Sequence, residues 1–303
     1  MPVTHPHPTL AQSRSRLAAV MVSPAIAVMV LVAGFPVLYA VWLSLHEYSL
    51  RTPGLSRWAA PFALGNYLTA LSSQEFWSAL RTTLAFTAIS VVLELALGMA
   101  MALLMQRVAR GSAFLRAAVL VPWSVLTVVT AIMWRSVFDP TLGFVNTVLG
   151  ALGLPADTVW LGSTPQAFVV MVVADVWKTA PFMALLLLAG LQGIPRETYE
   201  AAAVDGASAW QRFWRITLPL LRSALLVALI FRTLDALRIF DLPYTLTKGA
   251  FGTDTLSLLA FRQLQEQGIV GLGSALSVLT FLVVMAISVI YIRLMRPNAG
   301  SAR

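Results

Sequence analysis

Residues 200–219 read EAAAVDGASAWQRFWRITLP and separate two long apolar segments of the chain. The alanines at 201–203 favour helix, and Asp205 and Gly206 predict a break with a possible N-cap. The residues after the break favour a second helix that lasts until Pro219. Because apolar and polar side chains share that second helix, a short amphipathic helix lying on a membrane surface is one sufficient interpretation of the pattern.

Long apolar blocks make up most of the chain on either side. Of 303 residues, 58% are hydrophobic and 11% are charged, whereas soluble domains have roughly 45–50% apolar and 25% charged residues. About 20 apolar residues cross a bilayer as a helix, and six segments qualify, namely 17–45, 82–105, 115–137, 167–191, 220–240 and 273–295. We therefore predict an all-α polytopic membrane domain of six transmembrane helices over residues 17–295. Its first segment is too long for a signal peptide.

The basic residues predict the orientation of these helices. If the N-terminus is cytoplasmic, twelve basic residues lie on the cytoplasmic side and four lie outside, which is the bias that membrane proteins show. We expect both termini to be cytoplasmic, as tails at 1–16 and 296–303, with a cytoplasmic loop at about 192–219. This distribution accounts for the net charge of +8, so we expect no nucleic-acid partner.

The loop resembles the EAA loop of ABC importer permeases. That pattern is Glu-Ala-Ala, three residues, Gly, nine residues and Ile-x-Leu-Pro, and residues 200–219 match every fixed position. The resemblance implies a type I ABC importer permease fold whose loop docks in a cleft of a separate ATPase subunit. It implies ATPase-coupling roles for Glu200, Ala201, Ala202, Asp205, Gly206, Ala207 and Trp210.

Further stretches resemble the carbohydrate permeases of the maltose-uptake type. They include 64–67, 76–77 and 80–84 near the second helix, then Trp177, Pro181, Phe182, 189–192, Ile194, Pro195 and Tyr199 before the loop, and 240–241 to 246–247 after it. Around 175–179 and 231–241 the chain is similar to the trehalose importers of mycobacteria. The resemblance implies a multi-pass protein of the bacterial inner or plasma membrane that translocates a di- or oligosaccharide, with trehalose or a maltose-like sugar expected.

The same resemblance implies the partners and the energy source. We expect a second homologous permease subunit, two ATPase subunits that bind ATP and Mg, an extracytoplasmic sugar-binding protein or lipoprotein, and membrane lipid. The chain itself would bind no cofactor, because neither Lys178 nor Lys248 lies in the Gly-Lys-Ser/Thr context of a P-loop. With no cysteine and three histidines, we expect no metal site.

Two other function classes fit the sequence less well. A secondary transporter could use Glu94 or Asp175 to carry protons, but it would have no reason to possess an EAA loop. A membrane-embedded enzyme would need clustered catalytic residues, and the acidic residues of this sequence are dispersed, so we expect no catalytic residue.

Five charged residues lie at membrane depth, and they are Asp175, Lys178, Arg232, Asp235 and Arg238. Each would cost about 2.5 to 3.5 kcal/mol at the centre of a lone helix, so they cannot face lipid. Their spacing of three residues allows ion pairs along an inward face. Structural ion pairs and sugar ligands are both consistent with this pattern, because sugar hydroxyls bind carboxylates and guanidinium groups. Glu94 is expected to be a packed, hydrogen-bonded group.

The resemblance assigns sugar-facing positions in the fourth and fifth helices. Counted without gaps from Glu200, they are Asp175, Lys178, Thr179, Phe182, Arg232, Asp235, Ala236 and Ile239, to which the charge of Arg238 adds a ninth candidate. Most residue types differ from those of the maltose-type permease. An aromatic ring is kept at Phe182, where it could stack on a sugar ring.

Overall fold

The computed structural model describes residues 10–52, 58, 60–62, 64–108 and 112–295. The regular secondary structure of the described part is helical, apart from one isolated antiparallel bridge between His46 and Phe62. In chain order the elements are α1 (Leu10–Met29), η1 (Val30–Gly34), α2 (Phe35–Ser44), α3 (Gly65–Ser72), α4 (Gln74–Arg107), α5 (Ser112–Val119), α6 (Val121–Ser124), α7 (Thr127–Val137), α8 (Phe144–Ala151), α9 (Thr164–Gln192), α10 (Arg196–Val204), α11 (Ala209–Arg212), η2 (Phe213–Thr217), α12 (Leu218–Leu220), α13 (Arg222–Ala236), α14 (Asp241–Thr247), α15 (Leu256–Phe261), η3 (Arg262–Glu266) and α16 (Val270–Met295). The η elements are short π-helical turns.

Four helices of the described residues are long and apolar enough to cross a membrane. They are Leu17–Ser44, Gln74–Arg107, Thr164–Gln192 and Val270–Arg293, and each overlaps a predicted segment. A fifth crossing requires that Ala209–Leu220 and Arg222–Ala236 count as one span, although their axes differ by 69°. The chain is therefore an all-helical membrane protein with four to five candidate spans by length and composition.

The prediction of a continuous helix over residues 115–137 is wrong. It is divided into α5, α6 and α7, of which α7 has 11 residues. Pro122 lacks a backbone N–H, and Val125 and Leu126 adopt extended or nearly extended conformations with ψ of 135° and 138°. Because a proline and two extended residues follow one another within five positions, the helical hydrogen bonds cannot run through.

Other boundaries also differ from the expectation. Helix α1 begins at Leu10, so residues 10–16 of the expected tail are helical, and the first candidate span begins at Leu17. Residues 1–9 and 296–303 lie outside the described residues. The fifth segment was expected to reach residue 240, but α13 ends at Ala236. Short helices α3, α8, α14 and α15 occupy stretches that were expected to be loops.

The centre of the molecule is the contact of α4 with α9, on which α13 packs. At this contact Gly98 lies where a Cβ would be 2.9 Å from Met183 Cγ. Gly190 lies where a Cβ would be 2.4 Å from Ala224 Cβ on α13. Small residues let membrane helices approach closely. These two glycines therefore fix α9 against both neighbours and bring the polar groups of the three helices within reach of one another.

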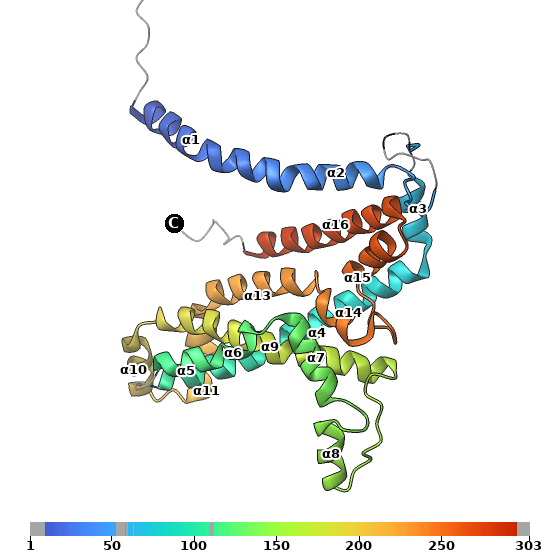
Figure 1. Ribbon diagram of the computed structural model, residues 1–303. Helices are drawn as coiled ribbons and strands as arrows, with labels where there is room; N and C mark the ends of the chain where they lie inside the picture. Colours follow the sequence, from blue (N-terminus) through green and yellow to red (C-terminus); the bar gives the residue numbers. More distant parts are fainter. Residues whose placement is uncertain (1–9, 53–57, 59, 63, 109–111, 296–303) are drawn as a thin grey trace, which may run out of the picture.

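Helices α1 and α2 form a long rod that leaves the body of the molecule (Figure 1). No residue of the 18-residue apolar window in this rod is buried within the described structure. Its α2 half packs against α16, and its end is held by Asn66, whose Nδ2 donates to the carbonyls of Ser44 at 3.0 Å and His46 at 2.9 Å. The start of α1, the pair α10 and α11, and the end of α16 lie toward one side of the molecule, and α3, α14 and α15 lie toward the other (Figure 1).

Candidate functional site

A buried ionic cluster joins the three central helices, and Arg232 of α13 is at its centre. Its guanidinium donates through Nε to Glu94 of α4 and through Nη2 to Asp175 of α9. Through Nη1 it reaches Asp235 Oδ2 at 2.8 Å. Glu94 is 0% exposed and Arg232 is 5% exposed. The cluster therefore links α4, α9 and α13 by charge-assisted hydrogen bonds, and its Glu94, Asp175 and Arg232 members are buried.

Glu94 is the member of this site that the sequence did not reveal. Counted as a lone carboxylate, it was expected only to be packed and hydrogen-bonded; that much is confirmed, because Thr179 Oγ1 donates to it at 2.6 Å and Arg232 donates to it as well. The sequence feature that points to a buried ion pair is the single charge of Glu94 in an otherwise apolar helix. Such a charge needs a partner from another helix, but the partner cannot be named from spacing.

A cavity of about 340 Å³ opens beside the cluster, and it is lined from α7, α9, α13 and α14. Seven of the nine predicted sugar-path residues line it, namely Asp175, Lys178, Thr179, Arg232, Asp235, Arg238 and Ile239. Thr127, Phe240 and Asp241 complete the lining, and the sequence had not singled them out for this site. Polar donors and acceptors thus converge from four elements on one small space.

Exposure divides the charged residues into two groups. Glu94, Asp175 and Arg232 are buried, whereas the side chain of Asp235 is 70% exposed. Arg238 is exposed as well, and its Nε donates to the Leu234 carbonyl at 3.2 Å. The buried residues form hydrogen bonds with one another and hold the helices together. Asp235 and Arg238 retain the capacity to form hydrogen bonds in the cavity.

Lys178 does not form the expected ion pair with Asp175 among the described residues. Its Nζ donates to the backbone carbonyls of Trp123, at 3.2 Å, and Val125. These carbonyls lie at the break between α6 and α7, where no helical N–H is available to them. Lys178 therefore stabilises the broken segment against α9, and it also lines the cavity.

The two remaining predicted residues do not line the cavity. Phe182 stacks on Trp123 with ring centroids 5.1 Å apart and planes 11° apart, so one face of the expected sugar-stacking ring is covered. Ala236 is fully buried in the hydrophobic core. The family resemblance placed both on the sugar path, but neither lines the described cavity.

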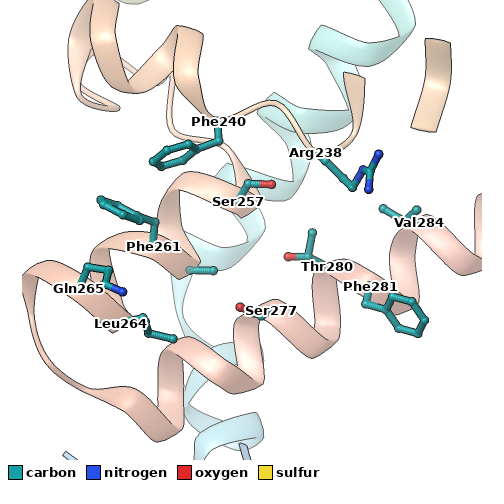
Figure 2. Close-up of a pocket in the computed structure, with 11 residues that line it drawn as sticks. Arg238, Phe240, Ser257, Phe261, Leu264, Gln265, Ser277, Thr280, Phe281 and Val284 are labelled. Carbon is teal, nitrogen blue, oxygen red and sulfur yellow. The ribbon is translucent and has the colours of Figure 1, made fainter. Parts of the chain in front are cut away.

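A second cavity of about 520 Å³ lies on the other side of Arg238 and Phe240, between α15 and α16 (Figure 2). Figure 2 shows Phe240 and Phe261 on one wall, and Ser277 and Thr280 on the facing helix. These hydroxyls already donate to backbone carbonyls at 2.9 and 2.8 Å. Mostly apolar walls with satisfied hydroxyls suit a sugar less well than the charged cavity does.

The loop at 200–219 has the predicted helix, break and second helix. Helix α10 ends in a Schellman motif, in which Ala207 N donates to Ala202 O at 2.9 Å and Gly206 N donates to Ala203 O at 3.1 Å. Gly206 has φ of +80°, and a Cβ there would meet nothing within 4 Å. Backbone conformation, and not lack of space, is therefore the reason for glycine at this turn.

The expected N-cap near Asp205 belongs instead to Ser208. Its Oγ accepts from Gln211 N at 3.3 Å, and Gln211 Oε1 accepts from Ser208 N at 2.8 Å, forming a capping box. Beyond the turn, Val204 is 89% exposed and Trp210 is 70% exposed. The loop thus presents a rigid apolar projection with no partner among the described residues except its own aromatic neighbours.

Replacing Arg232 by Ala should unfold or strongly destabilise the protein. It leaves Glu94 and Asp175 buried without their shared cation, and breaking a buried pair costs roughly 3–5 kcal/mol. The thermal unfolding midpoint of the detergent-solubilised protein measures the effect. The matched variant Arg238→Ala removes an exposed guanidinium and should leave the midpoint unchanged; equal midpoints for both variants would contradict a structural role for the cluster.

Comparisons with known proteins agree with this architecture. Residues 94–298 match the family model of the binding-protein-dependent transport system inner membrane component. The trehalose/maltose transport system permease protein MalF of Thermococcus litoralis is 44% identical over 285 residues, which cover 93% of this chain and 94% of that protein. The trehalose transport system permease protein SugA of Mycobacterium tuberculosis is 45% identical over 279 residues, which cover 92% of this chain and 88% of that protein.

Solved structures show the same fold. A chain of a bacterial alginate ABC transporter, in complex with an alginate pentasaccharide-bound periplasmic protein, superposes with a TM-score of 0.80 at 22% identity, covering 94% of this chain and 95% of that chain. A chain of the MetNI methionine ABC transporter superposes with a TM-score of 0.53 at 19% identity, covering 72% and 93%. The chain therefore belongs to the family of inner-membrane permease subunits of binding-protein-dependent ABC importers, on the carbohydrate branch, and is a transport subunit and not an enzyme.

Proposed function

We propose that this chain is the permease subunit of an ATP-driven importer for trehalose or a maltose-like disaccharide, which an extracytoplasmic binding protein delivers. The observation that carries the proposal is the 44% and 45% identity to two trehalose permeases over more than nine-tenths of the chain. The charged cavity between α9 and α13 is the sugar site. There, Asp235, Arg238 and Lys178 offer hydrogen bonds to sugar hydroxyls.

The chain crosses the membrane six times, with both termini in the cytoplasm. The crossings are α1 to α2, α4, α5 to α7, α9, α11 to α13, and α16. Supporting this count, the start of α1, the end of α16 and the pair α10 and α11 lie on one side of the molecule. The rod of α1 and α2 is covered by lipid and by a second, homologous permease, because its apolar window is unburied in this chain alone.

The loop around Gly206 couples ATP hydrolysis to the movement of the transmembrane helices. The exposed projection of Val204 and Trp210 docks on one of two ATPase subunits, which bind ATP and Mg. Helix α9 runs from the sugar site to α10, and α13 follows the 69° bend after the loop. A displacement of the loop is therefore transmitted to both helices that line the cavity, α9 and α13. Their movement opens the cavity alternately to the two sides of the membrane.

Gly206→Val should reduce transport by about tenfold or more. The left-handed conformation costs roughly 1–2 kcal/mol per L residue, β-branched residues are the least suited to it, and 1.4 kcal/mol is a factor of ten. The control is Gly206→Asn, because asparagine tolerates this conformation. The measurement is the rate of sugar uptake at equal amounts of protein in the membrane. Equal losses of uptake in both variants would argue against a conformational role of the turn.

Asp235→Ala should impair sugar-stimulated ATPase activity more than basal ATPase activity. The variant loses one charge-assisted hydrogen bond to sugar, worth about 1.5–3 kcal/mol, while Arg232 keeps Glu94 and Asp175. The KM for sugar should rise about tenfold or more with the unfolding midpoint unchanged. Asp157→Ala, an exposed acid outside the cavity, is the control. Parallel losses of both activities would assign Asp235 to the structural cluster instead.

Uptake of labelled trehalose into proteoliposomes tests the function as a whole. The vesicles contain this chain, its co-purifying permease and ATPase, and the matching binding protein, with maltose as competitor. We expect uptake that stops when ATP or the ATPase is left out. Uptake driven by a proton gradient in vesicles that contain this chain alone would show a secondary transporter and overturn the proposal.

A further inference from the structure

A recess lined by four arginines lies at the end of the molecule where the loop helices meet the body. It has a volume of about 620 Å³ and lies among the ends of α4 and α9 and the helices α5, α10 and α11. The arginines are Arg107, Arg116, Arg196 and Arg212. Of the described residues that line it, none is acidic. Figure 1 shows α5, α10 and α11 gathered at this end of the bundle.

These guanidinium groups lack the partners that satisfy Arg232. Among the described residues, none of the four forms an ion pair. The Nε atoms of Arg116 and Arg212 are buried and have no hydrogen-bond acceptor in the described part of the chain. A buried donor without an acceptor costs about 1–3 kcal/mol, and more when it is charged. An anion with several acceptor oxygens would satisfy both arginines.

The walls of the recess indicate where that anion comes from. Its inner side is apolar, formed by Met105, Leu191 and Ile194. Helix α5 carries Arg116 toward the recess and has Phe114 81% exposed. A short helix with one basic and one apolar face lies at the membrane interface. In the proposed orientation the recess adjoins the surface that meets lipid, at the cytoplasmic ends of α4 and α9.

We propose that this recess binds the phosphate group of an anionic phospholipid from the cytoplasmic leaflet. Basic pockets between helix ends on the cytoplasmic side are suited to phospholipid headgroups, and arginine forms bidentate hydrogen bonds with phosphate oxygens. A free phosphate would offer the same oxygens. The apolar inner wall and the adjoining α5 favour the lipid, whose glycerol and acyl groups they can contact. The inference rests on the proposed orientation and not on the identity of the sugar.

Binding at this place would act on the coupling loop. Arg196 and Arg212 belong to α10 and α11, whereas Arg107 and Arg116 belong to the body. Tyr199 also lines the recess, and its hydroxyl lies 3.1 Å from Thr217 Oγ1 of η2. One phosphate held by both pairs of arginines would tie the loop to α4 and α5. The lipid would therefore set the position from which the loop transmits motion.

The test is lipid binding to the purified, delipidated complex of this chain with its permease and ATPase partners. Dioctanoyl phosphatidylglycerol is titrated, and the shift of the thermal unfolding midpoint gives an apparent Kd. We expect Arg116→Gln and Arg212→Gln to weaken binding at least tenfold. The matched control is Arg215→Gln, because Arg215 is exposed in the same loop and does not line the recess. If the Arg116 or Arg212 variant lowers the unfolding midpoint in the absence of lipid, the variant Arg196→Gln, at an exposed position, is used instead.

Three further arms separate the sources of the anion. Dioctanoyl phosphatidylcholine, which has no net charge, should bind at least tenfold more weakly than phosphatidylglycerol, and inorganic phosphate should not compete at millimolar concentration. Equal binding by the two lipids, competition by inorganic phosphate, or unchanged binding in all three lining variants would overturn the proposal. Lipid binding that is detected only after the ATPase subunits are removed from the complex would overturn it as well, and would make the recess a protein-docking site. A sugar-transport failure leaves this result unaffected, because no sugar is present.

Discussion

The ion pairs that Arg232 makes with Glu94 and Asp175 are the interaction on which the centre of this permease depends. One buried guanidinium connects α4, α9 and α13, and each carboxylate comes from a different helix. Bringing these groups out of water is costly, and the cost is offset only when geometry and hydrogen bonds are complete. Gly98 and Gly190 supply that geometry, because they let the three helices approach closely enough for the charges to meet. Packing and electrostatics are thus two aspects of one contact.

This arrangement divides a single group of charges into buried members and exposed members. The buried members satisfy one another, so they hold the helices. The exposed members, Asp235 and Arg238, keep free hydrogen-bonding capacity beside the same helices. A ligand in this cavity would contact α9 and α13 together. Helix α9 leads to α10 and the loop around Gly206, and the chain returns from that loop to α13 through a 69° bend, so helical segments connect the cavity and the loop.

The faces that remain open also have a common physical explanation. In a bilayer every backbone polar group must be satisfied within the protein, but apolar side chains may face lipid. The rod of α1 and α2 can therefore keep its apolar window unburied while α2 packs against α16 and Asn66 anchors its end. The broken segment between α6 and α7 obeys the same rule, because Lys178 satisfies the carbonyls that the break leaves free.

By itself the sequence determined the membrane class, most of the long helices and the turn at Gly206, because hydropathy, chain length and turn chemistry are local properties. Tertiary structure decided which charges meet, that Glu94 joins Arg232, that Lys178 binds carbonyls, and that Phe182 is covered by Trp123. Spacing along one helix says which side chains share a face. It does not say how far that helix is rotated and shifted against its neighbours, and a buried ion pair depends on that rotation.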